Sequence, residues 1–411
     1  MSKKIWFVHH YAGSPLLGMS YRAYYFVREF NRTGHVAHVI GASHHHLLMH
    51  EKTSQDENVT FQLIEDAPFV LIKTSKHALG NKVKRLLNMF TFMYRLRREY
   101  KKIIQQTGKP DIIICSSPHL MTYLATQYIA KNCNAKHILD VQDIWPDSIT
   151  QLLAVSKWHP LAVLLRRIEK ISYVQSDAIV TVLENFSTYL SQFKITHQKH
   201  YYIPNGIDEH INASVLLPEK IVSKIALLKK NGAFIIAYTG SHGIPNALDQ
   251  FIDAAKIVNN DNKANIHFIL VGNGSEKKRL EHKAALLNNM SFFGTISKGA
   301  VYRLLNQVDA CYIGWQNKSI YQYGVSANKI FDYMLAGKPI IHAVNTNFDP
   351  VKEAGCGIIV PPNQPELLAN SFEYIATLDK SILEAMGKKA KNFVMANHTY
   401  KKLAEQYMCL F

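Results

Sequence analysis

Short runs of β-branched and aromatic residues alternate with longer helical patterns along almost the whole chain. Such runs occupy residues 36–40, 178–182 and 266–271, for example. A strand followed by a helix, repeated many times, is typical of βαβ units and of parallel sheets covered by helices. The length of 411 residues is enough for two or three domains. We therefore predict an α/β protein with more than one doubly wound parallel sheet.

Thirteen runs are expected to form strands. They lie at residues 5–9, 36–40, 59–64, 111–115, 138–141, 178–182, 201–203, 234–239, 266–271, 291–293, 310–313, 339–342 and 358–360. The segment from Pro204 to Gly232 has no strand pattern and separates two parts of comparable length. We place one domain at residues 1–205 and a second at 206–396, which includes the linker 206–232. Two such domains are expected to face a central cleft at the carboxyl ends of their strands.

The composition excludes several classes of protein. A hydrophobic fraction of 47% excludes a disordered chain, and five cysteines without CxxC spacing indicate neither a disulfide framework nor a zinc site. We expect a cytosolic protein, because no signal peptide or membrane-spanning run is evident. The net charge of +16 is large enough to attract an anionic surface or a phosphorylated substrate.

Much of this charge lies between Lys73 and Lys102, where ten basic residues accompany one acid, Glu99. Apolar residues recur there every three or four positions, which predicts an amphipathic helix over residues 82–105. They are Val83, Leu86, Leu87, Phe90, Met93, Leu96, Tyr100 and Ile103 or Ile104. This helix either lies on an anionic membrane or packs its apolar stripe inward with its charges solvated. Nucleic acid is not an expected partner, because no known binding module is present.

The sharpest motif is YQYGVSANKIFDYMLAGKPII, residues 321–341. Ser326 is expected to cap a helix that begins near Asn328, and Gly337 is expected to end it. The free amides of such a helix terminus favour an anion, and Lys329 adds a full charge. Asp332, one turn on, is placed to accept hydrogen bonds from a ribose. The alternative is an ordinary capped helix with a surface lysine and aspartate.

Two further segments contain glycine-rich strand exits. In the first, a strand ends in Gly240, Ser241, His242 and Gly243, and small residues there let a phosphate or sugar approach the next helix. His242 would offer a hydrogen bond or partial positive charge. The second, LVGNGS from Leu270, is as consistent with a structural role as with a functional one.

The first half contributes polar groups after strands as well. We assign Gly18 and Arg22 to a loop and helix that face the cleft, and Gln142 to a strand end where it could reach a ligand. Asp143 beside it could orient an acceptor hydroxyl or stabilise positive charge, unless it or Asp147 only caps the next turn.

A histidine run, His44 to His46 with His50, suggests a metal site, but no cysteine or acid completes a ligand set. We therefore predict no metal.

Taken in order, several motifs resemble the glycosyltransferase family four of the GT-B fold. They are IPNGID, YTGSHG, LVGNGS, FFGTIS, VSANKIFDYMLAGKPII and GCGIIVPP, which together extend over nearly the whole chain. The segments LDVQDIWPDSI and VSANKIFDYM are most similar to a bacterial branch that includes O-antigen and capsule transferases such as N-acetyl-fucosaminyl transferases.

This resemblance implies two Rossmann-like domains and a C-terminal helix, residues 397–411, that returns to the first domain. The family's pair of donor-binding glutamates falls on Gly324 and Asp332, so the first acid is missing and the second is one methylene shorter. Asn328 and Lys329 match the diphosphate cradle, and Gly294, Thr295 and Ile296 match the loop beside the base. Gln142 stands where a histidine is often found.

The function implied is a retaining, metal-independent transfer of a hexose or N-acetylaminosugar from a nucleotide-diphosphate donor, which we expect to be UDP-linked. No cofactor is expected, because the nucleotide sugar is a substrate. The expected acceptor is a lipid-diphosphate-linked glycan in O-antigen, capsule or lipopolysaccharide biosynthesis at the cytoplasmic membrane face. Asp143 and Lys329 are the catalytic candidates. The alternatives are a nucleotide-sugar 2-epimerase of the same fold and a non-catalytic peripheral membrane protein.

Overall fold

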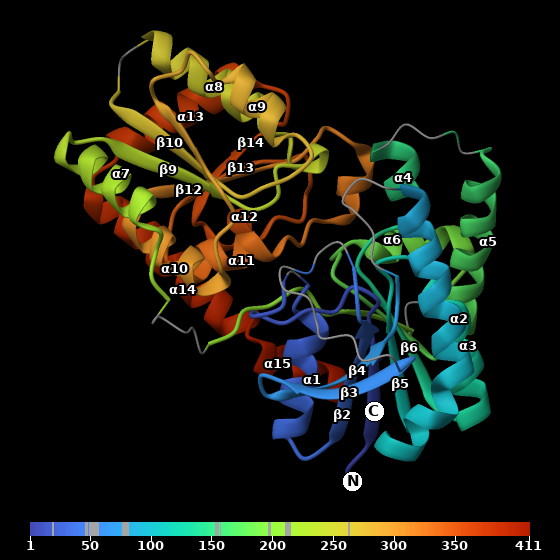
Figure 1. Cartoon of the computed structure of the whole chain (residues 1–411). Coiled ribbons are helices and arrows are strands. Elements are labelled where there is room, and N and C mark those ends of the chain that lie inside the picture. The colour runs from blue at the N-terminus through green and yellow to red at the C-terminus, as the bar shows by residue number, and fades with distance from the viewer. Residues whose placement is uncertain are drawn as a thin grey trace. The chain divides into compact units, whose positions relative to one another are not determined.

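A computed structural model describes the chain apart from residues 19, 46–47, 49–56, 76–81, 153–155, 157, 196–198, 210–214 and 262–263, and apart from the side chains at 82, 83, 149, 151 and 152. The chain forms two compact units (Figure 1). Unit 1 comprises Met1–Pro204 together with Tyr400–Phe411, and unit 2 comprises Asn205–Thr399.

The described part of unit 1 is built on an eight-stranded sheet in the order β3-β4-β2-β1-β5-β6-β7-β8. Its strands are β1 (Lys4–Val8), β2 (Val36–Ala42), β3 (Val59–Ile64), β4 (Ala67–Ile72), β5 (Ile112–Ser116), β6 (Lys136–Val141), β7 (Ala178–Thr181) and β8 (His200–Tyr202). Its helices are α1 (Arg22–Arg32), α2 (Lys82–Thr107), α3 (Met121–Cys133), α4 (Asp147–Leu152), α5 (Pro160–Gln175), α6 (Phe186–Leu190), the 3₁₀ turn η1 (Ser191–Phe193) and α15 (Tyr400–Met408).

Helices cover both faces of this sheet, so the central strand β1 is buried on both sides. In β1, Ile5 and Phe7 pack in one hydrophobic core with α1 and α15, and Trp6 and Val8 pack in another with α2 and α3. Successive side chains of a strand point to opposite faces, so a continuous apolar run feeds two cores. Figure 1 shows α15 beside α1, although more than 360 residues of chain lie between them.

One strand of unit 1 departs from the expected pattern. The sequence prediction missed β4 and expected only parallel pairing, whereas β4 pairs parallel with β2 and antiparallel with β3. Only Glu65 and Asp66 connect β3 to β4, and Glu65 has a φ of 55°. A two-residue connection can join antiparallel strands only, so the sheet of unit 1 is mixed.

The predicted apolar stripe of helix α2 is buried in the second half of the helix but exposed in the first half. Phe92, Leu96 and Ile103 are fully buried, whereas Leu87 is 57% and Phe90 40% exposed. The predicted stripe therefore combined residues from two faces, because it followed apolar spacing and omitted Phe92. The second half of the helix packs inward, and its first half leaves apolar residues at the surface.

A buried ion pair joins several segments of unit 1. Arg22 and Asp140 are 2% and 0% exposed, and the shortest distance between their charged atoms is 2.8 Å. Arg22 also donates to the carbonyl oxygens of Ile203 at 2.8 Å and Pro204 at 2.7 Å. Asp140 accepts from the Tyr407 hydroxyl in α15 at 2.8 Å. The guanidinium holds the pKa of Asp140 below its usual value against the opposing effect of burial.

The described part of unit 2 contains a parallel six-stranded sheet in the order β11-β10-β9-β12-β13-β14. Its strands are β9 (Phe234–Thr239), β10 (Ile266–Val271), β11 (Met290–Phe293), β12 (Ala310–Gly314), β13 (Ile340–Ala343) and β14 (Gly357–Val360). Its helices are α7 (Glu219–Lys230), α8 (Leu248–Asp261), α9 (Lys277–Lys283), α10 (Lys298–Gln307), α11 (Asn328–Leu335), α12 (Pro350–Ala354), α13 (Pro365–Thr377) and α14 (Lys380–Asn397), with 3₁₀ turns η3 (Ile244–Asn246) and η4 (Ser319–Tyr323). The predicted two-domain α/β architecture is confirmed.

We predict that Arg22→Met lowers the free energy of unfolding of unit 1 by about 3–5 kcal/mol, because Asp140 would remain as a buried charge without its partner. Urea denaturation followed by circular dichroism measures this loss. Lys102→Met is the matched control: it breaks the exposed pair with Glu57 and should cost at most about 1 kcal/mol. Equal losses in the two variants would contradict a structural role for the buried pair.

Candidate functional site

The carboxyl edge of the sheet in unit 2 gathers the segments that the sequence singled out. The chain runs from β9 to β10 and β11 on one side, and β12 lies on the other side of β9. The strand order therefore reverses at β9, and ligands of open α/β sheets bind outside the strand ends at such a point. Residues 240–243 follow β9, and α11 brings Lys329 to the same turn: a Cβ at Gly240 would lie 2.9 Å from Lys329 Nζ.

Lys329 is held by two oxygen atoms of the same unit. Its Nζ donates to the Tyr238 hydroxyl and to Asn246 Oδ1, both at 2.8 Å. It also lies 4.3 Å from the centroid of the Tyr238 ring. Burial lowers the pKa of the ammonium to about 7, and Asp332 opposes this effect only in part. The site therefore contains a lysine that is partly neutral near pH 7 and would gain charge beside an anion.

The glycines of LVGNGS have a structural role in the turn after β9. A Cβ at Gly272, where φ is 150°, would lie 1.8 Å from the Gly240 carbonyl oxygen, and one at Gly274 would lie 2.4 Å from the His242 carbonyl oxygen. Because these two glycines have no Cβ atom, the two loops can share backbone hydrogen bonds. His242 N donates to Asn273 O at 2.9 Å, and Glu276 N donates to His242 O at 3.0 Å. Close packing of backbones thus determines the shape of the turn.

His242 is fully buried beneath this turn. Neither of its ring nitrogens has a hydrogen-bond partner among the described residues. Burial lowers its pKa to about 4, and the charges of Lys277 and Lys329 add to this effect. The expected partial positive charge on His242 is therefore wrong for neutral pH: the ring is neutral and can act only through hydrogen bonds. Ser241, beside it, is half-buried.

Helix α11 begins at Asn328, as predicted, but Ser326 does not cap it. The capping position is Ala327, which has no side-chain acceptor. Ser326 instead accepts hydrogen bonds from Asn205, at 3.2 Å to its hydroxyl and 2.7 Å to its carbonyl oxygen. The first amides of α11 thus lack the expected side-chain partner. The side-chain oxygen of Asn328 is also buried and has no partner in the described part of the chain.

Asp332, the expected ribose partner, is already engaged within unit 2. Its carboxylate accepts from Lys298 at 2.5 Å and from the Tyr302 hydroxyl at 2.9 Å, and the residue is 7% exposed. A carboxylate has further lone pairs, so a ribose contact requires an approach beside these two groups. The sequence reading missed Lys298 and Tyr302; the only signal for them was the Ser297 cap of α10, which the structure contains.

The predicted base-side loop lies between β11 and α10. Gly294 and Thr295 are exposed, and Ile296 is half-buried. Lys277 joins this region to the preceding loop, because its Nζ donates to the carbonyl oxygens of Gly272 at 2.9 Å and Phe293 at 2.7 Å. The loop is therefore anchored to the turn packed beside Gly240.

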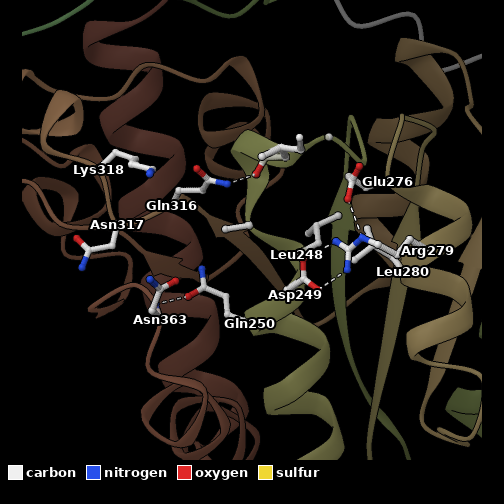
Figure 2. Close-up of a pocket in the computed structure, with 13 residues that line it drawn as sticks. Leu248, Asp249, Gln250, Glu276, Arg279, Leu280, Gln316, Asn317, Lys318 and Asn363 are labelled. Atoms are coloured by element: carbon white, nitrogen blue, oxygen red, sulfur yellow. Dashed lines mark hydrogen bonds and ion pairs between the residues drawn. The ribbon is translucent and has the colours of Figure 1, made fainter. Parts of the chain in front are cut away.

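A separate pocket of about 330 Å³ lies beside residues 243–250, which follow the β9 turn (Figure 2). Most of the side chains that line it are polar. Among them, Arg279 forms a bidentate ion pair with the Asp249 carboxylate, at 2.6 and 2.8 Å. Gln316 donates to the Ile244 carbonyl oxygen at 3.2 Å. Of the predicted strand exit after β9, Gly243 lines this pocket, whereas Gly240, Ser241 and His242 do not. Its side chains are largely satisfied by one another, so we assign it no ligand.

In unit 1, the structure corrects the assignment of Arg22. Its guanidinium is buried and bound to Asp140 and two carbonyl oxygens, so it stabilises the fold and is not placed to contact a ligand. Gly18 is buried and bridges to Leu48. Gln142 donates to the Ser116 hydroxyl at 2.5 Å, and Asp143 is exposed after β6.

Other polar groups of unit 1 also have structural partners. Asp147 pairs with Arg166 at 2.5 Å. Within the histidine run, His45 contacts the Ala12 carbonyl oxygen at 3.1 Å, and His46 and His50 lie outside the described residues. No group of three possible metal ligands occurs in the described part of the chain.

Family models match both halves of the chain. The model described as Glycosyltransferase Family 4 matches residues 17–210, and the model described as Glycosyl transferases group 1 matches residues 233–377. The chain carries both domains of a GT-B glycosyltransferase. The second match spans the β9 turn, the loop after β11 and the start of α11. The candidate site in unit 2 therefore lies within the group 1 domain.

Curated relatives of this glycosyltransferase are distant. An uncharacterized glycosyltransferase of Methanocaldococcus jannaschii is 24% identical over 60% of this chain and 61% of its own length. The probable glycosyltransferase WbjE of Pseudomonas aeruginosa is 21% identical over 72% of this chain and 73% of its own. WcaI of Escherichia coli K12, a putative colanic acid biosynthesis glycosyl transferase, is 24% identical over 72% and 74%.

Solved structures share the fold over nearly the full length. Sucrose-phosphate synthase from Thermosynechococcus elongatus superposes with a TM-score of 0.74 at 15% identity, covering 99% of this chain and 97% of its own. HepE from Anabaena, solved with UDP and glucose, has a TM-score of 0.67 at 16% identity and 99% coverage of both chains. WaaG, involved in lipopolysaccharide biosynthesis, has a TM-score of 0.65 at 13% identity and 98% coverage of both.

The lowered pKa of Lys329 predicts a pH dependence of stability. Between the folded-state pKa of about 7 and the unfolded value near 10.5, the unfolded chain binds more protons, so this residue makes stability rise with pH. Lys329→Met should abolish that contribution. We expect the difference in free energy of unfolding, wild type minus variant, to increase from pH 7 to pH 10 in urea denaturation. A difference that stays constant or falls would contradict the buried, partly neutral lysine.

Proposed function

We propose that this glycosyltransferase is a retaining, metal-independent enzyme that takes a hexose or N-acetylaminosugar from a UDP-linked donor to a hydroxyl group. The main support is the pairing of Lys329 with the uncapped start of α11 beside the β9 turn. Backbone amides and an ammonium at one point form a site for a diphosphate. The UDP found in HepE supports the choice of nucleotide.

Lys329 would bind the donor diphosphate in its charged form. In the free protein, Tyr238 and Asn246 hold the ammonium in place and burial lowers its pKa. A bound diphosphate would raise that pKa, because an opposite charge nearby favours the protonated form. The nucleoside would lie toward Gly294, Thr295 and Ile296, with the ribose beside Asp332. His242 and Ser241 would contribute neutral hydrogen bonds under the β9 turn.

Transfer of the sugar leaves negative charge on the departing diphosphate of the donor. The bond between the anomeric carbon and the diphosphate oxygen breaks, and the acceptor oxygen forms the new bond on the same face of the sugar. The acceptor proton passes to the departing phosphate oxygen, so no protein base is required. Lys329 and the α11 amides stabilise the negative charge that grows on the leaving group. Asp143, exposed after β6, would orient the acceptor or stabilise positive charge at the anomeric carbon.

For the biological role, we propose surface polysaccharide assembly at the cytoplasmic face of the membrane. Colanic acid biosynthesis in the name of WcaI and lipopolysaccharide biosynthesis in the description of WaaG support O-antigen, capsule or lipopolysaccharide as the product. The acceptor would be a lipid-diphosphate-linked glycan. The five cysteines are free thiols, which is consistent with a reducing compartment.

Lys329→Met should lower the rate of UDP release from UDP-glucose, or from the best donor in a nucleotide-sugar screen, by about a hundredfold. UDP should bind at least about tenfold more weakly in calorimetry, because a charge-assisted hydrogen bond is lost. Lys352→Met removes an exposed lysine of the same unit and serves as the control, with both quantities unchanged.

Other outcomes of this experiment identify the competing functions. Unchanged UDP release in Lys329→Met would contradict the proposed role of the lysine. An epimerised sugar formed from the donor alone would identify a nucleotide-sugar 2-epimerase. Absence of binding heat with UDP, GDP and ADP for the wild-type protein would favour a non-catalytic protein.

We also propose that the first half of α2 docks on an anionic membrane. Its exposed apolar residues include Leu87 at 57%, Phe90 at 40% and Tyr94 at 60% exposure. Lys84 and Arg85 are exposed on the same turns. An apolar stripe flanked by cations matches the interface of an anionic bilayer, where each cation contributes about 1 kcal/mol. No helix in the described residues has the length and apolar character to cross a membrane.

The double variant Leu87→Glu with Phe90→Glu should reduce partitioning onto vesicles that contain phosphatidylglycerol by at least about tenfold, because it removes buried apolar area and adds like charge. Sedimentation with such vesicles measures the bound fraction. Leu286→Glu changes an exposed leucine of unit 2 and should leave binding unchanged. Equal binding of all three proteins, or equal binding to phosphatidylcholine alone, would contradict the proposal.

A further inference from the structure

The sheet of unit 1 has its own reversal point, between β1 and β5. From β1 the order runs through β2 and β4 to one edge, and through β5, β6 and β7 to the other. Val8 at the end of β1 pairs with Cys115 near the end of β5, so the segments that leave these strands start side by side. Such a reversal is where open α/β sheets bind ligands. The sequence prediction placed Gly18 in the loop after β1 but gave His10 and His119 no role.

A chain of hydrogen bonds fills this position. His10, after β1, lies 2.6 Å from His119, after β5, through Nδ1 and Nε2 respectively. The other nitrogen of His10 lies 2.8 Å from Asn88 Oδ1 in α2. The three side chains are 0%, 3% and 1% exposed. The His10 ring also stacks between Tyr11 and Phe92, with ring centroids 4.5 and 4.6 Å away.

The partners of Asn88 determine where the protons lie. Asn88 Nδ2 donates to the carbonyl oxygens of Ser75 at 2.9 Å and His44 at 3.3 Å, which fixes the orientation of the amide. Its Oδ1 can only accept, so His10 Nε2 must carry a proton. Neutral His10 then has a lone pair on Nδ1, and His119 Nε2 must donate to it. The other ring nitrogen of His119, Nδ1, is therefore unprotonated and can only accept a hydrogen bond.

This acceptor has no partner. His119 Nδ1 is buried and unpaired in the described part of unit 1, as is the hydroxyl oxygen of Ser117, which is 2% exposed and two residues away. A buried acceptor without a donor costs about 1–3 kcal/mol, so such groups usually have a function or a bound partner. Two of them at the exit of one strand, at the reversal point of the sheet, indicate a ligand-binding position.

The protonation of the histidines near His119 determines which class of ligand could bind there. Burial lowers the pKa of His119 to about 3, and the nearby His9 and Arg85 act in the same direction. Burial also lowers the pKa of His9, which contacts the Ser20 hydroxyl at 3.2 Å, to about 4. His9 and His119 are therefore neutral at pH 7, whereas Arg85 keeps its charge and lies over the Tyr11 ring. The unprotonated Nδ1 of His119 suits a neutral hydrogen-bond donor such as a hydroxyl group.

We propose that His119 Nδ1 and Ser117 Oγ form a subsite in unit 1 that binds an uncharged sugar through its hydroxyl groups, and that His10 and Asn88 are positioning residues that fix the tautomer of His119. The proposal rests on the proposed function, because sugar transfer is what requires such a subsite. It names residues that no part of the donor site in unit 2 uses.

Two substitutions of His119 distinguish a ligand-binding role of this residue from a purely structural one. His119→Gln can still place an amide nitrogen near the old Nε2 and donate to His10, but it loses the acceptor at Nδ1. His119→Asn keeps an acceptor near Nδ1 and loses the bond to His10. If the Nδ1 acceptor binds ligand, the glutamine variant fails to bind although it keeps the internal bond. A purely structural histidine predicts the opposite order.

The probes are methyl glycosides of glucose, galactose and N-acetylglucosamine, added to the full chain labelled with ¹⁵N in histidine. At pH 7 we expect the Nδ1 resonance of His119, assigned by its absence from His119→Gln, to be that of an unprotonated nitrogen and to shift with at least one glycoside. Inorganic phosphate should not shift it. Glycoside affinity should fall at least about tenfold in His119→Gln and stay within about threefold in His119→Asn.

Several results would overturn the subsite. They are a protonated Nδ1, a shift caused by phosphate and by none of the glycosides, no shift with any glycoside, or equal glycoside affinity of His119→Gln and wild type. UDP titration by calorimetry in the same samples reports on unit 2 separately. Failure of wild-type protein to bind UDP would count against the proposed function, whereas normal UDP binding with a silent His119 would remove only this inference.

Discussion

The Arg22–Asp140 ion pair is the interaction on which unit 1 depends most. It is enclosed by α1, β6 and α15, and Arg22 also binds the carbonyl oxygens of the last two residues before unit 2 begins. A buried ion pair is stable only when hydrogen bonds satisfy the remaining donors and acceptors. Here the Tyr407 and Ser116 hydroxyls and two carbonyl oxygens supply those bonds. The pair therefore attaches the C-terminal segment and the chain exit to the sheet of unit 1.

In unit 2, the decisive constraint is close approach of backbones. Gly272 and Gly274 allow the loop after β10 to pack directly on the turn after β9. That turn then lies against Lys329, whose ammonium is held by two neutral oxygen atoms and is short of solvation. An ammonium in such surroundings gains more from an incoming anion than a solvated one does, because less water must be displaced. The packing thus prepares a site for an anion beside a lysine whose desolvation Asp332 offsets only in part.

The carboxyl edges of the two sheets differ in their electrostatics. Unit 2 combines a titratable lysine with the start of a helix, which suits a diphosphate. Unit 1 presents imidazoles whose pKa values burial has lowered well below neutrality, which suits hydroxyl groups. Both situations arise from desolvation, which disfavours charge on any group that has no partner. A lysine near pKa 7 responds to an anion, whereas a histidine near pKa 3 or 4 does not become charged at pH 7.

Local pattern by itself determined the α/β class, most strands and the start of α11 at Asn328, because strand periodicity and helix signals depend on nearby residues. It could not determine that Arg22 is buried, that Asn205 engages Ser326, or that Asp332 pairs with Lys298, since each contact joins distant segments. His10 and His119 are separated by 109 residues, so only the folded sheet brings them together. Burial in that sheet, and no property of the sequence around either histidine, decides their protonation.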